Sequence, residues 1–197
     1  MSSRTAQDAK TLARRYYPGH DVYDAETRNV FFERWIYAGR ASTVSDPGSY
    51  FLCEIESESV IVLKDSDGKL RAHHNVCRHR GTRLLTEPQG QLPKSIQCPY
   101  HAWTYHLDGR LKQAPHTDDL VDFDPSTICL DTLAVEEFGG FVYVNLDPTA
   151  TPMAGLASDL ATEIAHWEPD VERLTLAHRL TYEISSNWKN VIDNFLE

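Results

Sequence analysis

Two short segments of this chain each hold one cysteine and one histidine, and this constrains the fold most. The first reads Cys77-Arg-His79-Arg-Gly and the second Cys98-Pro-Tyr-His101, with residues 80 to 97 between the two pairs. Thiolate sulfur and imidazole nitrogen are ligands for zinc and for iron–sulfur clusters. Any fold of this chain must therefore bring two loops together, so that four side chains meet around one inorganic centre.

The order Cys, His, Cys, His matches the needs of a Rieske [2Fe–2S] centre, in which two cysteines bind one iron and two histidines bind the other. Neutral imidazoles make the core less negative, so Rieske potentials lie at roughly −150 to +300 mV, against about −400 mV for plant-type ferredoxins. The alternative is a zinc-stabilised binding module. Zinc sites more often pair Cys with Cys and His with His along the sequence, and an iron and sulfide assay separates the two cases.

The residues around both pairs extend the pattern to Asn75-Val-Cys-Arg-His-Arg-Gly and to Cys98-Pro-Tyr-His-Ala-Trp-Thr-Tyr105. In this form it closely resembles the Rieske non-haem iron oxygenases. The resemblance implies a mainly β, antiparallel Rieske domain with its ligands on two loops, and it implies that the cluster ligands are Cys77, His79, Cys98 and His101. Ala102 stands where the family commonly has glycine, which affects the backbone freedom of the second loop rather than ligation.

Composition excludes several other classes. The 197 residues carry a net charge of −10, which argues against nucleic acid or an anionic membrane as a partner. We find no 18-residue apolar run and no secretory h-region at the N-terminus, so we expect a cytoplasmic protein without a membrane segment. Cys53 and Cys129 are expected to be small buried hydrophobic residues rather than a disulfide, because cytosolic thiols stay reduced.

Hydrophobic periodicity and turn residues predict three regions. Residues 1–40 form an N-terminal extension with a helix, residues 41–150 the Rieske domain, and residues 151–197 the truncated start of an α+β catalytic domain. The predicted helices are Asp24–Trp35, Leu156–Trp167 and a last one that begins at Trp188 after the capping residues Ser185-Ser-Asn187. The predicted strands are Tyr50–Ile55, Val60–Leu63, Leu70–His74, Trp103–Leu107, Arg110–Gln113, Gly140–Leu146 and Thr175–Ile184.

Several residues near the two pairs have more than one interpretation. His73 and His74 point to opposite faces of a strand, so one should be packed and the other exposed. Trp103 and Tyr105 are expected to be core residues under the second loop rather than electron relays. The arginines of the first loop form salt bridges, or they raise the potential of a cluster that becomes anionic on reduction; they are Arg78, Arg80 and Arg83.

The last eleven residues place four polar side chains at i, i+3, i+4 and i+7 of a helix, namely Asn190, Asp193, Asn194 and Glu197. Such a stripe is usually a solvated helix face. The segment from Asn187-Trp-Lys to Glu197 nevertheless resembles the one that opens the active site of these oxygenases. The resemblance implies that Glu197 bridges a Rieske histidine of one subunit and an iron-ligand histidine of the next. Asp193 and Asn194 would belong to the same polar route, with Asp193 in place of the usual Glu.

By resemblance, the chain is part of a terminal oxygenase component that is a homotrimer. A reductase or ferredoxin would supply electrons from NAD(P)H to the [2Fe–2S] centre. From there they would reach a mononuclear Fe(II), whose ligands lie beyond residue 197, for O₂-dependent hydroxylation or oxidative demethylation. Glutamate at the bridging position resembles the subgroup that acts on quaternary ammonium compounds such as betaines and carnitine, and aromatic substrates are the alternative.

A second class of function is a Rieske ferredoxin that only carries electrons. The N-terminal helix and the Asn187-Trp-Lys segment argue against it, because such a carrier needs neither. A respiratory-complex Rieske protein is disfavoured because that family has an extra cysteine in each ligand loop, and these loops have none.

Overall fold

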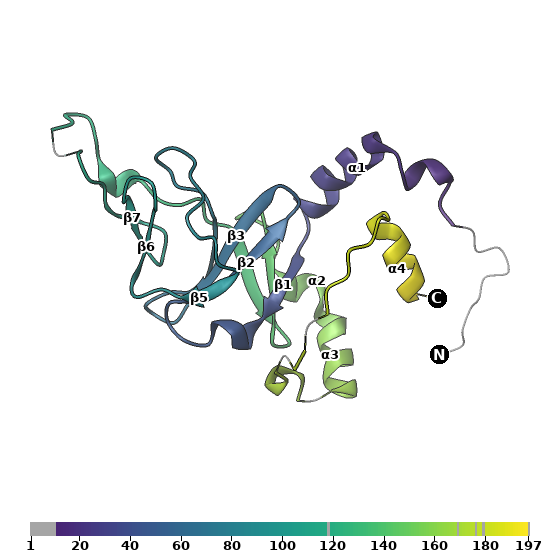
Figure 1. The fold of residues 1–197 in the computed structure, drawn as a ribbon. Helices are drawn as coiled ribbons and strands as arrows, with labels where there is room; N and C mark the ends of the chain where they lie inside the picture. Colours follow the sequence, from purple (N-terminus) through teal and green to yellow (C-terminus); the bar gives the residue numbers. More distant parts are fainter. Residues whose placement is uncertain (1–10, 118, 169, 176, 179, 197) are drawn as a thin grey trace.

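The computed structural model describes residues 11–117, 119–168, 170–175, 177, 178 and 180–196. Its centre is built of three antiparallel sheets (Figure 1). The first has the order β1-β10-β9, the second β4-β3-β2-β5 and the third β6-β7-β8. The strands are β1 (Ile36–Arg40), β2 (Ser49–Ile55), β3 (Glu58–Lys64), β4 (Leu70–His74), β5 (Gln89–Gln91), β6 (Ser95–Gln97), β7 (Thr104–His106), β8 (Leu111–Gln113), β9 (Ala134–Phe138) and β10 (Phe141–Asn145). The mainly β, antiparallel fold expected from the sequence is confirmed.

The apolar run of β3 explains how the sheets stack. Val60, Ile61, Val62 and Leu63 are all fully buried, although successive side chains of a strand point to opposite faces. Val60 and Val62 pack in a core shared with β10, whereas Ile61 and Leu63 pack in a core shared with β6, β7 and both ligand cysteines. The second sheet is therefore the middle layer, and one of its faces supports the ligand loops.

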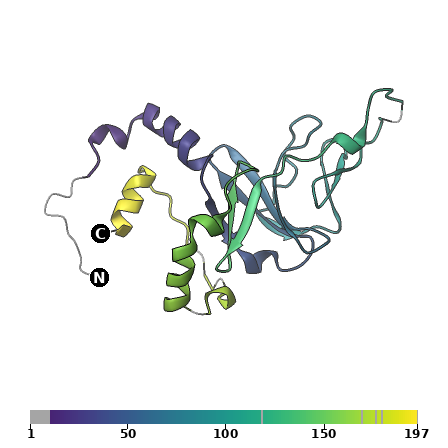
Figure 2. The same cartoon turned by 180° about the vertical axis from the view of Figure 1, so that it is seen from behind.

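Helices flank the strands at the two ends of the chain. They are α1 (His20–Glu26), which continues as a π-helix over Thr27–Phe31, α2 (Met153–Leu156), α3 (Ser158–Trp167) and α4 (Trp188–Leu196). Short 3₁₀ turns lie at Arg14–Tyr16, Ala41–Val44, Pro125–Thr127 and Val171–Arg173. Figures 1 and 2 show α1 and α4 near each other on one side of the sheets, with the β6–β7 hairpin on the opposite side.

Two predicted elements need correction. The first helix begins at His20 and ends at Phe31 rather than spanning 24 to 35, and Trp35 instead anchors the chain through a hydrogen bond from Nε1 to Thr151 O at 2.9 Å. The predicted strand Thr175–Ile184 is wrong: its described residues pair with no strand. A strand needs a hydrogen-bonding neighbour, and here Tyr182 is 74% exposed.

The segment after α3 is tied to the first sheet by Arg40. This side chain is buried, and its Nη2 donates to the carbonyl oxygens of Val171 at 2.9 Å and Leu174 at 2.6 Å. In the described part of the chain, no helix has the length and apolar character needed to cross a membrane. The cytoplasmic location stays a prediction.

Candidate metal centre

The two ligand segments share one backbone design. In the first loop (residues 77–82), Cys77 N donates to Thr82 O at 2.8 Å and Gly81 N donates to Cys77 O at 2.9 Å. In the second loop (residues 98–103), Cys98 N donates to Trp103 O at 2.8 Å and Ala102 N to Cys98 O at 3.1 Å. The fifth residue of each loop is left-handed, with φ +69° at Gly81 and +59° at Ala102. Each loop thus closes tightly, with its Cys buried and its His at the surface.

The loops bring all four predicted ligands together as two pairs. Cys77 and Cys98 are each 2% exposed, and their thiols interact with each other. His79 and His101 lie at the surface with their Nδ1 atoms 3.1 Å apart. Two nitrogens bound at about 2.1 Å to one metal ion, near a right angle, lie about 3 Å apart. The histidine pair therefore fits one iron, through Nδ1 of each ring.

The pairing distinguishes a two-iron cluster from zinc. A structural zinc site needs four donors converging on one ion. Within the residues described, no three or more His, Cys, Asp or Glu side chains are placed to hold a single metal ion. A buried thiol pair and a separate imidazole pair are what a cluster with two cysteines on one iron and two histidines on the other requires.

Aromatic rings fix the two imidazoles. The indole of Trp103 stacks on His79 with centroids 4.8 Å apart and planes at 9°, and Trp103 is buried as predicted. Tyr100 stacks on His101 at 3.7 Å. Burial, His101 and Arg80 lower the pKa of His79, so its ring tends to be neutral and has a lone pair for a metal.

Tyr105 is a functional residue that sequence reasoning treated only as core. It is fully buried, as predicted, and its hydroxyl lies 3.2 Å from Cys77 Sγ while accepting from Arg78 N at 3.1 Å. Burial and the hydrogen bond to Cys77 raise the pKa of the phenol, so it stays protonated and can donate to sulfur. Burial also raises the pKa of Cys77, and the Tyr105 hydrogen bond opposes that shift.

Asn75 is a second residue that sequence reasoning passed over. Its Oδ1 accepts from Leu84 N at 3.1 Å and Leu85 N at 2.8 Å, and its Nδ2 donates to Leu85 O at 2.7 Å. The side chain is fully buried and closes the base of the first loop. An amide two residues before a ligand cysteine was the available sequence signal.

Other residues near the loops have structural partners. Arg78 pairs with Asp131 and Arg83 with Glu54, which confirms the salt-bridge interpretation for these two. His73 is fully buried and its Nε2 lies 3.2 Å from Leu107 O. The packed member of the predicted pair is therefore confirmed, but His74 is half-buried beside Glu58 rather than exposed. Cys53 is buried and Cys129 half-buried, and neither forms a disulfide.

The predicted terminal helix is present, but it lies away from the ligand loops. Asn187 Oδ1 accepts from Lys189 N at 3.0 Å and caps the helix start, as expected. Asp193 accepts a hydrogen bond from Tyr17 at 3.0 Å, Asn194 is exposed, and Glu197 lies outside the described residues. Within one chain, α4 and the ligand loops lie on opposite sides of the sheets (Figures 1 and 2).

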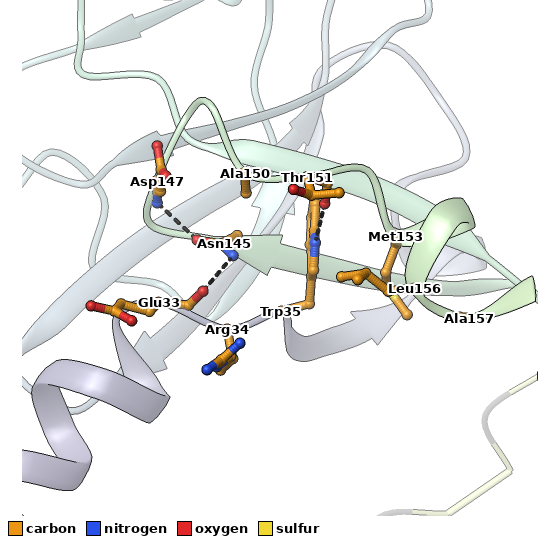
Figure 3. A pocket seen from close by; sticks show the side chains of 10 residues that line it. All are labelled: Glu33, Arg34, Trp35, Asn145, Asp147, Ala150, Thr151, Met153, Leu156 and Ala157. Atoms are coloured by element: carbon orange, nitrogen blue, oxygen red, sulfur yellow. Dashed lines mark hydrogen bonds between the residues drawn. The ribbon is translucent and has the colours of Figure 1, made fainter.

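A separate cavity of about 610 Å³ lies where β1 begins, beside α2 (Figure 3). Asn145 forms its floor by donating to Glu33 O at 3.0 Å and accepting from Asp147 N at 2.9 Å. Trp35 and Leu156 line its apolar side. None of the predicted site residues lies in this cavity.

The fold and the paired donors define a Rieske iron–sulfur domain. Residues 34–128 match the family model described as "Rieske [2Fe-2S] domain". The chain therefore contains a Rieske [2Fe–2S] domain, and a [2Fe–2S] cluster is its cofactor.

More particular relatives follow from the whole sequence. The chain is 37% identical to the carnitine monooxygenase oxygenase subunit of Escherichia coli K12, over 97% of this chain and 51% of that protein. It is 33% identical to the glycine betaine monooxygenase oxygenase subunit of Pseudomonas aeruginosa, over 97% of this chain and 44% of that protein. A solved quaternary ammonium Rieske monooxygenase, CntA with L-carnitine, matches with a TM-score of 0.90 at 34% identity, over 95% of this chain and 53% of that one. These matches confirm the resemblance to Rieske oxygenases, and this chain spans about half the length of the relatives.

Proposed function

We propose that Cys77 and Cys98 bind one iron of the cluster and that His79 and His101 bind the other through Nδ1. The observation that carries this assignment is the 3.1 Å separation of the two Nδ1 atoms, beside a thiol pair that is buried. When bound, a Rieske cluster takes up and releases single electrons. The protein's part is to bury the thiolates, donate one hydrogen bond from Tyr105 and hold both imidazoles in fixed planes.

We further propose that the chain is the N-terminal part of a terminal oxygenase subunit. In this reading the boundaries are 1–40 for the extension, 41–150 for the Rieske domain and 151–197 for the start of a catalytic domain. A reductase or ferredoxin using NAD(P)H supplies the electrons, and a mononuclear Fe(II) is held by the remaining half of such a protein. The half-length match to oxygenase subunits supports this proposal.

We propose that the protein acts as a homotrimer and that electrons pass between its subunits. Support for transfer between subunits comes from the position of α4: within one chain, a route from the ligand loops to α4 would have to cross the sheets (Figures 1 and 2). We propose that Glu197 receives an imidazole N–H from a Rieske histidine of one subunit and another from an iron-ligand histidine of the next. A carboxylate can accept both bonds and thereby fix the orientation of the two rings. Asp193 and Asn194, which we assign to the same polar route, lie on α4.

We propose a quaternary ammonium substrate and O₂-dependent hydroxylation or oxidative demethylation. Support comes from the relatives, which are carnitine and glycine betaine monooxygenase subunits. The test uses the full-length, cluster-loaded protein with a reductase. Oxygen uptake and product formation with carnitine or glycine betaine, and none with an aromatic hydrocarbon, are expected. The reverse preference would overturn the substrate proposal and leave the cluster assignment intact.

Glu197→Gln tests the bridge in the same protein. Glutamine keeps the size but presents an NH₂ group to one imidazole N–H. Cluster content and reduction by the reductase should be unchanged, while reoxidation of the cluster with substrate and O₂ should slow steeply in a single turnover. Equal reoxidation rates would overturn the bridging role of Glu197.

A further inference from the structure

The Asn187-Trp-Lys segment contacts a carboxylate far away in the sequence. Both oxygens of Glu26 accept from Lys189 Nζ, at 2.6 and 2.8 Å, and one also accepts from Trp188 Nε1 at 2.9 Å. Lys189 and Glu26 side chains are only 9% and 15% exposed. Two of the three residues of this motif therefore bind one acidic side chain of α1, and the third, Asn187, caps α4.

The N-terminal segment that carries Glu26, here called the brace (residues 14–32), is also attached to the Rieske domain. Tyr23 donates a hydrogen bond to Glu56 in the turn between β2 and β3. Phe31 and Phe32 pack against the core between the first two sheets. The ring of Phe31 also meets Trp188 edge-on, with centroids 5.5 Å apart. The brace thus touches the sheet system on one side and α4 on the other (Figure 1).

A third contact reaches the polar face of α4. The hydroxyl of Tyr17 donates to Asp193 Oδ2 at 3.0 Å. Burial and the hydrogen bond to Asp193 raise the pKa of Tyr17, which keeps the phenol as the donor. Asp193 is therefore held by a group that lies outside α4 and outside the Rieske sheets.

We propose that the brace sets the position of α4 relative to the cluster-bearing sheets, with Glu26 as its anchor and Tyr17 as a positioning residue for Asp193. This proposal rests on the proposed function, because α4 carries Asp193 and directly precedes Glu197 in the sequence, and both are assigned to electron transfer between subunits. It gives the Asn187-Trp-Lys segment a physical role: it is the docking site of the brace. The strength of the anchor comes from burial, since removing one partner of a buried ion pair leaves an uncompensated charge.

The first test measures amide hydrogen exchange in the full-length, cluster-loaded protein. Glu26→Gln should speed exchange in residues 188–196 by about 100-fold, because it leaves Lys189 without a counter-charge. Residues 77–82 and 98–103 should exchange as in the wild type. Asp24→Asn, an exposed carboxylate on the same helix, is the matched control and should change neither region. Unchanged exchange in α4 of Glu26→Gln would overturn the proposal.

The second test uses Tyr17→Phe, which keeps the ring and removes one hydrogen bond. Exchange in α4 should rise only about threefold, and the cluster potential and its reduction by the reductase should not change. Reoxidation of the reduced cluster with substrate and O₂ should slow several-fold. If Tyr17→Phe and Glu26→Gln both reoxidise at the wild-type rate, the brace only packs against α4. That result would overturn its positioning role.

The two proposals fail in different ways. Absence of iron and sulfide from the wild-type protein, or no substrate-dependent reoxidation in it, would overturn the proposed function. The exchange experiment would still decide whether Glu26 holds α4. If the wild type turns over substrate normally, and Glu26→Gln and Tyr17→Phe match it in amide exchange and in reoxidation rate, only the proposal about the brace is overturned.

Discussion

The two ligand loops have the same backbone hydrogen bonds but are stabilised in different ways. The first loop has glycine at its left-handed position and a buried amide, Asn75, that closes its base. The second has alanine at the equivalent position, Ala102, and the ring of Tyr100 stacks on His101 within the loop. One loop relies on conformational freedom and polar contacts, and the other on ring packing. The comparison teaches that the same ligand geometry can be reached from different local sequences.

The largest expected effect tests whether both loops are equally necessary for binding the cluster. Cys77→Ser and Cys98→Ser should each abolish the cluster, because both thiolates are needed on one iron. The wild type should contain about two irons and two sulfides per chain, and each variant should lack sulfide and visible colour. One zinc per chain without labile sulfide in the wild type would contradict the cluster assignment.

The next largest effect is expected for Asn75→Ala, which should lower the stability of the protein by removing the buried amide at the base of the first loop. The substitution leaves the N–H of Leu85 and the carbonyl of Leu85 without their side-chain partner, and it leaves Leu84 N with only the longer bond to the backbone oxygen of residue 75 at 3.3 Å. The loss should cost about 2 kcal/mol in the free energy of unfolding. Denaturant unfolding of the cluster-loaded protein measures this. Gln97→Ala, on the strand before the second loop and exposed, is the control and should change little. A loss below about 0.5 kcal/mol in Asn75→Ala would show that the first loop does not depend on the amide.

Tyr105→Phe tests a contact between β7, the strand after the second loop, and Cys77 of the first loop. The phenol stabilises the thiolate more strongly when the cluster is reduced and more negative, so its removal should lower the reduction potential. A hydrogen bond of about 1 kcal/mol corresponds to about 40 mV for one electron. Redox titration measures the shift, and iron and sulfide content should stay normal. An unchanged or raised potential would contradict a donor role for Tyr105.

The smallest effects come from exchanging the left-handed residues. A Cβ at Gly81 would meet no atom within 4 Å, so Gly81→Ala adds only backbone strain of about 1 kcal/mol. Ala102→Gly relieves the same strain, and the extra freedom of the unfolded chain offsets part of the gain, leaving about 0.5 kcal/mol of added stability. Unfolding curves should therefore shift in opposite directions. A shift of both in one direction would show that the two loops are not equivalent.

Structural features that depend on residues close together in the sequence could be predicted from it. The ligand loops, the strands from Tyr50 to His74 and the start of α4 follow from spacing, alternation and a capping residue. Contacts between distant segments could not be predicted in this way. Glu26 and Lys189 are 163 positions apart, and neither has a periodicity that points to the other. The strand predicted at Thr175–Ile184 is absent from its described residues. A hydrophobic pattern indicates only that one face of a segment could be buried, whereas a strand also needs a neighbouring strand to pair with.

The crossed contacts of Trp103 and Tyr105 affect any attempt to move this centre to another protein. Trp103 is the last residue of the second loop but stacks on the histidine of the first, and the hydroxyl of Tyr105 lies beside Cys77. Neither loop is therefore a portable unit. A transplant of the first loop alone would lose the indole beneath His79 and the hydroxyl beside Cys77. The smallest piece that keeps both is the continuous stretch from Asn75 to Tyr105, carried on a sheet that can bury the cysteines, so grafting must succeed or fail with both loops at once.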